Sequence, residues 1–297
     1  MAGWGYGSKN GPHAWSKQFP VGDGQRQSPI DIITAQTKPD EALEASPLEI
    51  SYDPKDEQVI GNTGHGWKVD YTSGTSSIRG GPLEGEYALA QYHCHWGREE
   101  DRGSEHTIDG KRYAAELHLV HYNKKYGSFA AAADKSDGLA VIGIFLKVGK
   151  ENKELLKVTN AMKDIKYNGS KTKIEPTDPD NFMPETVRPA GGSGDLSVPG
   201  RAPTSSDTRV YWTYEGSLTT PPLYESVTWI VFADPTEISK EQLAEFRHLK
   251  RHANDDEKGE DSDDDDGIIA DNYRPPMPTG ERAVRSCNAP VKFVKKQ

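Results

Sequence analysis

The chain has 297 residues, of which 34% are hydrophobic, and this length fits one large β-rich domain. The formal net charge is −10, but residues 255–266 hold nine acidic residues and one lysine, so the remainder is near −2 and has no basic face that would bind nucleic acid. No apolar stretch approaches the length of a transmembrane helix, and the many prolines and glycines indicate turns rather than long helices.

The first clear strand covers residues 87–96, where two sets of side chains alternate. One face is expected to carry Leu89, Gln91, His93 and His95. The opposite face is expected to carry Ala90, Tyr92, Cys94 and Trp96.

Three further strands are predicted at residues 114–122, 139–148 and 225–233. In the first, Glu116, His118 and Val120 share a face. The second is apolar on both faces, and the third places Val227 and Trp229 together. These patterns predict a mainly β (α+β) fold with a large central, mostly antiparallel twisted sheet and short peripheral helices.

Two helices are expected outside the sheet. Residues 152–165 carry an apolar stripe, and Ser239 with Gln242 forms a predicted capping box for a helix that continues through Leu249.

Residues 188–207 and 255–266 are interpreted as surface insertions in a single domain that spans residues 1–297. The second segment resembles a calcium-binding loop, but Gly267 falls one position late and Asn272 replaces the bidentate glutamate. We therefore expect weak contact with divalent cations or basic proteins rather than a specific calcium site.

Cys94 and Cys287 are interpreted as free thiols in a reducing compartment. The first residues lack the basic and apolar regions of a secretory signal. A cytoplasmic location is expected; the glycosylation sequon at residues 168–170 is a weak argument for secretion, which is less favoured.

The histidines at the end of the first strand indicate a metal site. His93 and His95 share a face, and His118 on a neighbouring strand can complete a three-nitrogen site with an open fourth position, as catalytic zinc requires. Gln91 and Glu116 lie two residues before a ligand and are expected to accept the outer ring N–H groups.

Five other histidines are interpreted without a metal. His106 and His121 are expected to be hydrogen-bonded structural residues, whereas His13, His248 and His252 are expected at the surface.

Several motifs, in the right order, give the chain a resemblance to α-class carbonic anhydrases, most closely the cytosolic animal members. They lie at residues 3–20, 25–32, 91–97 (QYHCHWG), 103–123, 137–149, 211–232 (YWTYEGSLTTPPLYESVTWIVF) and 271–275 (DNYRP).

The resemblance implies reversible hydration of carbon dioxide to bicarbonate, by attack of zinc hydroxide held by the three histidines. It assigns His65 as the proton shuttle, Thr219 and Glu105 as the pair that orients the nucleophile, and Tyr6 and Thr220 as parts of the shuttle's water network. The residues implied in substrate binding are Val120, Val141, Leu218, Thr219, Thr220, Val227 and Trp229. A monomer inhibited by sulfonamides is expected.

Some positions differ from the fastest members of this family. Thr63 and Lys68 replace asparagines, and a cation at Lys68 is predicted to disfavour protonated His65 and to alter proton transfer. Ser28-Pro29 and Pro221-Pro222 match positions of cis peptides in the family.

Two alternatives remain at this stage. A cupin would use His93, His95 and Glu99 as ligands, but His106 stands where a glycine is expected. A carbonic-anhydrase-related binding protein without catalysis would use the acidic insertion for cation or protein contacts.

Overall fold

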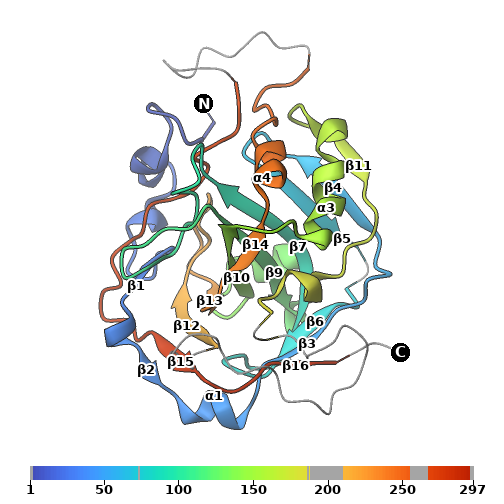
Figure 1. Cartoon of the computed structure of the whole chain (residues 1–297). Helices are drawn as coiled ribbons and strands as arrows, with labels where there is room; N and C mark the ends of the chain where they lie inside the picture. The colour runs from blue at the N-terminus through green and yellow to red at the C-terminus, as the bar shows by residue number, and fades with distance from the viewer. Residues whose placement is uncertain (1–2, 73, 186, 188–209, 255–266, 295–297) are drawn as a thin grey trace.

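The computed structural model describes residues 3–72, 74–185, 187, 210–254 and 267–294 (Figure 1). The two expected insertions, 188–207 and 255–266, lie outside these residues. The single domain over residues 1–297 therefore stays a prediction.

Fourteen strands of the described chain form one sheet, along the path β11-β4-β5-β7-β9-β10-β13-β12-β15-β2. Its strands are β2 (Lys38–Pro39), β3 (Glu49–Ser51), β4 (Gln58–Asn62), β5 (Trp67–Tyr71), β6 (Ser77–Arg79), β7 (Glu86–Trp96), β9 (Ala115–Asn123), β10 (Leu139–Val148), β11 (Lys171–Lys173), β12 (Tyr211–Gly216), β13 (Val227–Phe232), β14 (Thr236–Ile238), β15 (Arg285–Cys287) and β16 (Lys292–Phe293). A separate parallel pair joins β1 (Asp31–Ile32) to β8 (Thr107–Ile108).

The long central strands are antiparallel neighbours, β5 with β7, β7 with β9 and β9 with β10. Strand β10 then pairs in parallel with β13 and β14, and two short outer pairs are also parallel. The prediction of a large, mostly antiparallel sheet is confirmed.

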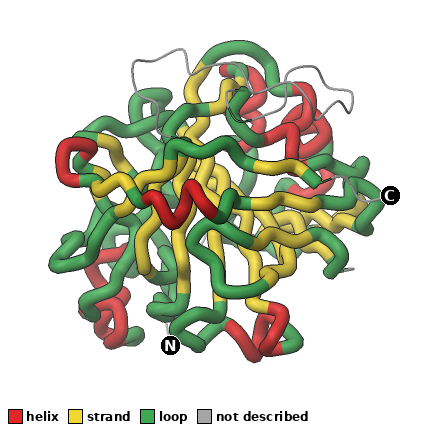
Figure 2. The backbone as a smooth tube through the Cα atoms, turned by 90° about the horizontal axis from the view of Figure 1, so that it is seen from below, coloured by secondary structure: helices red, strands yellow, loops and turns green. Residues whose placement is uncertain are grey.

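Helices are short and surround the strands (Figure 2). The α-helices are α1 (Glu41–Ala45), α2 (Phe129–Ala132), α3 (Lys153–Asn160) and α4 (Lys240–Phe246). The 3₁₀ turns are η1 (Pro12–Lys17), η2 (Pro20–Asp23), η3 (Thr34–Gln36), η4 (Lys124–Tyr126), η5 (Met162–Ile165) and η6 (Pro179–Phe182).

Both helix predictions are correct in place but too long. The capping box of Ser239 and Gln242 is present, yet α4 ends at Phe246, and Leu249 lies beyond it. The predicted helix over residues 152–165 divides into α3 and the 3₁₀ turn η5. In both cases the apolar periodicity continues past the last α-helical hydrogen bond, because 3₁₀ and irregular turns can also bury apolar side chains.

A β-bulge at Ala90 corrects the predicted facing of β7. Leu89 pairs with His121 and Gln91 with Val120, so Ala90 has no partner in the ladder. One extra residue in a strand reverses the alternation. Leu89 therefore packs in the core with Tyr92 and Cys94, instead of lying on the face of the histidines.

The sheet separates two apolar clusters. The larger one contains Cys94, Leu117 and Ile230, and the smaller one contains Val120 and Trp229. The face that carries the smaller cluster also carries the histidines, so the strands alone bring the candidate metal ligands beside an apolar wall. Cys94 and Cys287 are both free, as predicted, and the structure buries both.

Candidate metal centre

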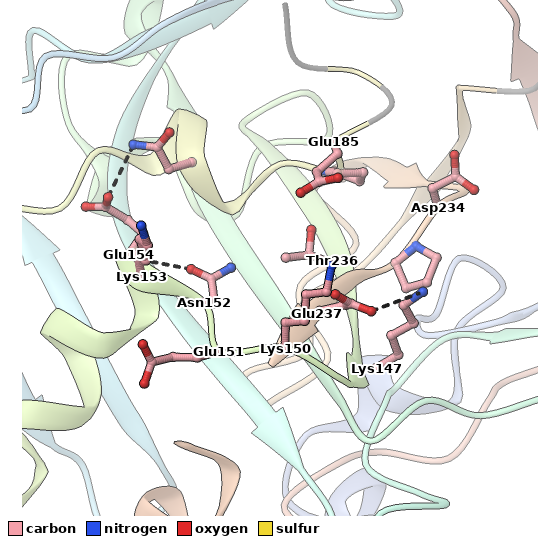
Figure 3. A pocket seen from close by; sticks show the side chains of 13 residues that line it. Lys147, Lys150, Glu151, Asn152, Lys153, Glu154, Glu185, Asp234, Thr236 and Glu237 are labelled. Atoms are coloured by element: carbon pink, nitrogen blue, oxygen red, sulfur yellow. Dashed lines mark hydrogen bonds and ion pairs between the residues drawn. The ribbon is translucent and has the colours of Figure 1, made fainter. Parts of the chain in front are cut away.

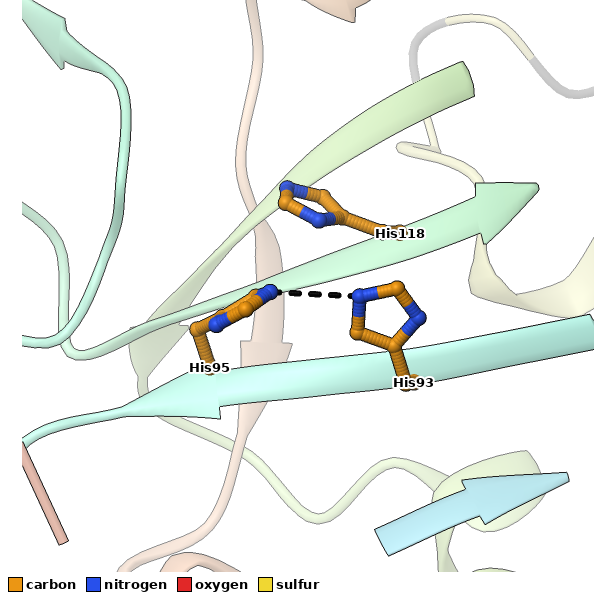
Figure 4. A group of neighbouring side chains, drawn as sticks. All are labelled: His93, His95 and His118. Atoms are coloured by element: carbon orange, nitrogen blue, oxygen red, sulfur yellow. Dashed lines mark hydrogen bonds between the residues drawn. The ribbon is translucent and has the colours of Figure 1, made fainter. Parts of the chain in front are cut away.

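Two adjacent strands hold the three predicted ligands close together. His93 and His95 lie on β7, and His93 pairs directly across the ladder with His118 on β9. One ligand atom from each histidine lies within 4.8 Å of the others. Figure 4 shows the three rings converging from the two strands, with His93 Nε2 only 3.2 Å from His95 Nε2.

Protein acceptors fix the proton position on each ring. His93 Nδ1 donates to Gln91 Oε1 at 2.8 Å, and His95 Nδ1 donates to the carbonyl oxygen of Asn272 at 2.7 Å. Since each neutral imidazole carries one proton, both Nε2 atoms present lone pairs. Two lone pairs that face each other at 3.2 Å repel, and a cation between them removes that repulsion.

Glu116 fixes the third ring in the opposite sense. Its Oε1 accepts His118 Nε2 at 2.7 Å and His106 Nδ1 at 2.7 Å, while Oε2 accepts the backbone N–H groups of Glu105 and His106. His118 therefore offers Nδ1 to the shared space. The same contacts confirm His106 as a buried structural residue, and His121 is buried between Tyr52 OH and the Ala140 carbonyl oxygen.

Burial keeps the candidate ligands neutral. It lowers the pKa of His95 to about 3, and it holds the pKa of His93 and that of His118 below the ordinary value. Burial opposes ionisation of Glu116, but its interactions with His106 and His118 outweigh that effect and hold the pKa of Glu116 well below its usual range. The result is three neutral nitrogen donors supported by one carboxylate.

Glu105 lies behind the ligands and is fully buried. Its Oε1 accepts the backbone N–H of Arg274 at 2.8 Å, and the Thr219 side chain also interacts with its carboxyl group. Burial raises the pKa of Glu105 well above its ordinary value. Its Oε2 has no hydrogen-bond partner among the described residues and lies 3.4 Å from His95 Nε2.

Apolar side chains cover the space beside His118. Val141 pairs with Val120 on one side and with Trp229 on the other, and the edge of the Trp229 ring lies against the His118 ring, with centroids 4.8 Å apart. Val227 belongs to the same cluster and Leu218 packs against it. All five residues predicted for the apolar wall therefore lie together.

The loop between β12 and β13 carries Leu218, which packs against this wall, followed by Thr219 and Thr220. Leu218 N donates to the Tyr224 carbonyl oxygen, and Trp229 Nε1 donates to the Ser217 carbonyl oxygen. Ser28 Oγ accepts the Ser217 N–H, which anchors the loop to the N-terminal segment. The cis peptides predicted at Ser28-Pro29 and Pro221-Pro222 are both present.

Comparison with known proteins agrees with this geometry. The family model for eukaryotic-type carbonic anhydrase matches residues 10–191 and 193–288. The chain is also 43% identical over 288 residues to carbonic anhydrase 1 of Mus musculus, covering 96% of this chain and 98% of the relative. The chain belongs to the eukaryotic-type carbonic anhydrase family. As a carbonic anhydrase, it is a carbonate dehydratase that hydrates carbon dioxide.

In this carbonic anhydrase, His65 lies half-buried in a turn between β4 and β5. Its ring stacks on Trp4 at 3.8 Å, and it lines a cavity of about 380 Å³ together with Trp4 and Tyr6. Burial lowers the pKa of His65. The Lys68 ammonium lies 2.7 Å from Asp70, and it is not among the causes of the His65 shift. Its predicted effect on proton transfer remains a prediction.

The contacts of residues 271–274 could not be predicted from the sequence, although the DNYRP motif at 271–275 belongs to the family resemblance. Asp271 accepts hydrogen bonds from Arg98 N and Arg102, Asn272 contacts His95, and Arg274 contacts Glu105. These contacts span more than 160 residues, so neither strand periodicity nor spacing reveals them. The available signal was the Asp-Asn pair directly after the apolar residues 268–270.

The remaining histidine predictions are mostly confirmed. His13 and His248 are exposed. His252 is half-buried instead of exposed, because its ring packs against Tyr167.

A separate polar cleft of about 730 Å³ lies where β10 ends and α3 begins (Figure 3). Lys147 faces Glu237 there at 3.8 Å. The buried carboxylate that lines this cleft belongs to Glu154, and it already accepts hydrogen bonds from Lys157, Asp178 N and Asn181. Because these bonds satisfy Glu154, the described lining of the cleft shows no unpartnered buried group like Glu105 Oε2 beside the histidines.

Among the described helices, none is both long and apolar enough to cross a membrane.

Proposed function

We propose that the carbonic anhydrase activity uses zinc bound by His93 Nε2, His95 Nε2 and His118 Nδ1. The observation that carries this proposal is the 3.2 Å distance between His93 Nε2 and His95 Nε2, because the Nδ1 contacts of both rings leave each Nε2 with a lone pair. Three neutral imidazoles suit zinc, whereas magnesium and calcium prefer oxygen ligands. Glu105 Oε2 is buried and has no hydrogen-bond partner within the described part of the chain, which fits a site that is completed by a bound group.

Zinc, when bound, supplies a Lewis acid that lowers the pKa of a coordinated water, an effect well known from carbonic anhydrases themselves. The residues around it set the orientation of the reacting groups. Glu105 accepts a hydrogen bond from the Thr219 hydroxyl, which leaves the Thr219 oxygen to accept a hydrogen bond from the nucleophile. A lone pair of the nucleophile then points toward the substrate.

The apolar cluster suits carbon dioxide, which is uncharged and weakly hydrated. Side chains that offer no hydrogen bonds leave the substrate free to react, and they exclude water from the carbon atom. The residues proposed for this wall are Val120, Val141, Leu218, Val227 and Trp229. Thr219 and Thr220 lie in the loop next to it and are proposed to contact the product bicarbonate.

His65 is proposed as the proton shuttle between the site and buffer. Its ordinary pKa near 6.5, lowered by burial, suits a group that accepts a proton and releases it near neutral pH. Tyr6 and Thr220 are proposed to hold the water molecules that connect His65 to the site.

The zinc proposal is tested by stopped-flow carbon dioxide hydration together with metal analysis. The enzyme is stripped with a chelator and reloaded with zinc, and His93→Ala is measured beside it. We expect one zinc per chain, loss of activity on stripping and recovery on reloading. Full activity in metal-free protein, or a metal-free His93→Ala variant as active as the parent, would refute it.

The shuttle proposal is tested with His65→Ala, with His248→Ala as a matched control because His248 is an exposed histidine. Loss of an acid–base group typically costs about 10²–10⁴-fold in the step it serves. We expect His65→Ala to lower kcat while kcat/KM changes little, and imidazole buffer to restore kcat. Equal kcat in His65→Ala and His248→Ala would contradict the proposal.

We further propose a cytoplasmic monomer that sulfonamides inhibit, since a deprotonated nitrogen can take the fourth zinc position. Sulfonamide binding should require zinc and be lost in His93→Ala. Weak cation or basic-protein contact through residues 255–266 stays a prediction, because these residues lie outside the described part of the chain. The non-catalytic alternative is not favoured, since the three histidines, Thr219 and Glu105 are all present and adjacent.

A further inference from the structure

Asn272 makes contacts with two functional parts of the enzyme at once. Its side chain is 2% exposed and lies between the end of β7 and the turn that carries His65. Nδ2 donates to the backbone carbonyl oxygen of His65 at 2.9 Å, and Oδ1 accepts the backbone N–H of Trp96 at 2.8 Å. Its own backbone carbonyl accepts His95 Nδ1.

These contacts use both ends of the amide and are directional. An amide side chain can donate through Nδ2 and accept through Oδ1, and here the two ends face an acceptor and a donor, respectively. The side chain therefore ties the His65 turn to the backbone next to His95. No isosteric side chain reproduces both contacts, because aspartate accepts at both ends.

The His65 turn joins β4 to β5, and β5 pairs with β7 from Lys68 onward. Within the turn, Thr63 N and Thr63 Oγ1 both donate to the Gly66 carbonyl oxygen, and Asn62 Oδ1 accepts the Gly64 N–H. These bonds shape the turn without contacting β7. The bond from Asn272 to the His65 carbonyl oxygen therefore adds a contact at the tip of the turn itself, and Gly66 leaves room for it, since a Cβ there would lie 3.2 Å from Asn272 Nδ2.

We propose that Asn272 is a positioning residue for proton transfer: its side-chain amide holds the His65 turn at a fixed place relative to the metal ligand His95. The inference rests on the proposed shuttle role of His65. Proton relays depend strongly on the distance and orientation of donor and acceptor, so a turn that drifts from β7 lengthens the path. The conversion of carbon dioxide does not use this path.

The discriminating variant is Asn272→Asp. It keeps the size of the side chain, its backbone contact with His95 and an acceptor for Trp96 N. It replaces the donor to His65 by a second acceptor, so one contact turns from attractive to repulsive. Asn272→Ala, which removes both side-chain contacts, serves as the second variant.

Asn123→Asp is the matched control. Asn123 is also 2% exposed, its Nδ2 donates to the Asp137 carbonyl oxygen, and its Oδ1 accepts the Lys125 N–H. Asn123→Asp makes the same change from donor to acceptor, but at the last residue of β9, away from the His65 turn. Any general cost of burying an aspartate therefore appears in both variants.

The experiment measures kcat, kcat/KM and zinc content by stopped-flow hydration in weak and in imidazole buffer. We expect Asn272→Asp to lower kcat by about fivefold or more, a larger factor than its effect on kcat/KM, with imidazole restoring kcat. Asn123→Asp should show no such split. If kcat and kcat/KM fall together, or zinc is lost, Asn272 merely supports the metal site and the inference is wrong.

Combination with His65→Ala separates this inference from the shuttle proposal. If His65→Ala lowers kcat and Asn272→Asp adds nothing to it, both hold, because the two residues act in one path. If His65→Ala lowers kcat but Asn272→Asp alone does not, the inference fails and the shuttle stands. If His65→Ala leaves kcat unchanged, the shuttle proposal fails, and the inference fails with it.

Discussion

Replacement of Glu116 by glutamine tests how the metal ligands are supported. The fully buried carboxylate accepts four hydrogen bonds, two from backbone N–H groups and two from the rings of His106 and His118. A glutamine has one acceptor oxygen and one NH₂ group. Whichever way it is oriented, its NH₂ group faces two N–H donors that lose their acceptor.

The cost follows from those two lost bonds. An unsatisfied buried donor costs about 1–3 kcal/mol, so with two such donors we expect the free energy of unfolding to fall by roughly 2–6 kcal/mol. Loss of the outer partner of a metal-binding histidine typically weakens metal binding about 10–100-fold, a range that includes measurements on carbonic anhydrases. We expect Glu116→Gln to show both effects.

Glu154→Gln provides the control, since Glu154 is a nearly buried carboxylate that also accepts several hydrogen bonds but lies away from the histidines. Urea unfolding measures stability, and competition with a chromophoric chelator measures zinc affinity. Glu154→Gln should lose stability and keep its zinc affinity. If Glu116→Gln binds zinc as tightly as Glu154→Gln does, the reasoning about ligand support is refuted.

Three further predictions concern histidines and one glycine. Because burial lowers the pKa of His65, its NMR titration midpoint should lie below 6.5, and a midpoint above 6.5 would contradict this. Burial lowers the pKa of His121 to about 3, so between pH 6.5 and pH 3 the unfolded chain binds a proton that the folded chain does not. His121 should therefore lower the free energy of unfolding by about 1.4 kcal/mol for each pH unit that the pH falls within that window. The free energy of unfolding of His121→Phe should depend less steeply on pH there than that of the parent. Gly64→Ala should destabilise the chain by about 1 kcal/mol or more, because Gly64 has φ +79° and a Cβ would lie 2.8 Å from the Asn168 side chain; unchanged urea unfolding would count against it.

Short-range patterns predicted the parts of the site that lie along single strands. The spacing of His93 and His95 follows from the two-residue period of β7, and Glu116 and His118 follow from the same period in β9. The ladder then brings His93 opposite His118. Neither prediction required any information about residues far away in the sequence.

Other features depend on contacts that no local pattern contains. The bulge at Ala90 reverses the facing of Leu89, because the strand follows the register of β9 instead of its own alternation. His118 offers Nδ1 to the metal site because its Nε2 donates a hydrogen bond to Glu116. The contact of Asn272 with His95 joins residues 177 positions apart, and only the folded chain shows it.

That last contact has a consequence for biosynthesis. Synthesis proceeds from the N-terminus at roughly 5–20 residues per second, so β7 and β9 leave the ribosome well before residues 271–274 exist. Until those residues emerge, His95 lacks the acceptor for Nδ1 and Glu105 lacks the N–H of Arg274. A nascent chain that stops short of residue 274 therefore has its central strands but no finished catalytic centre.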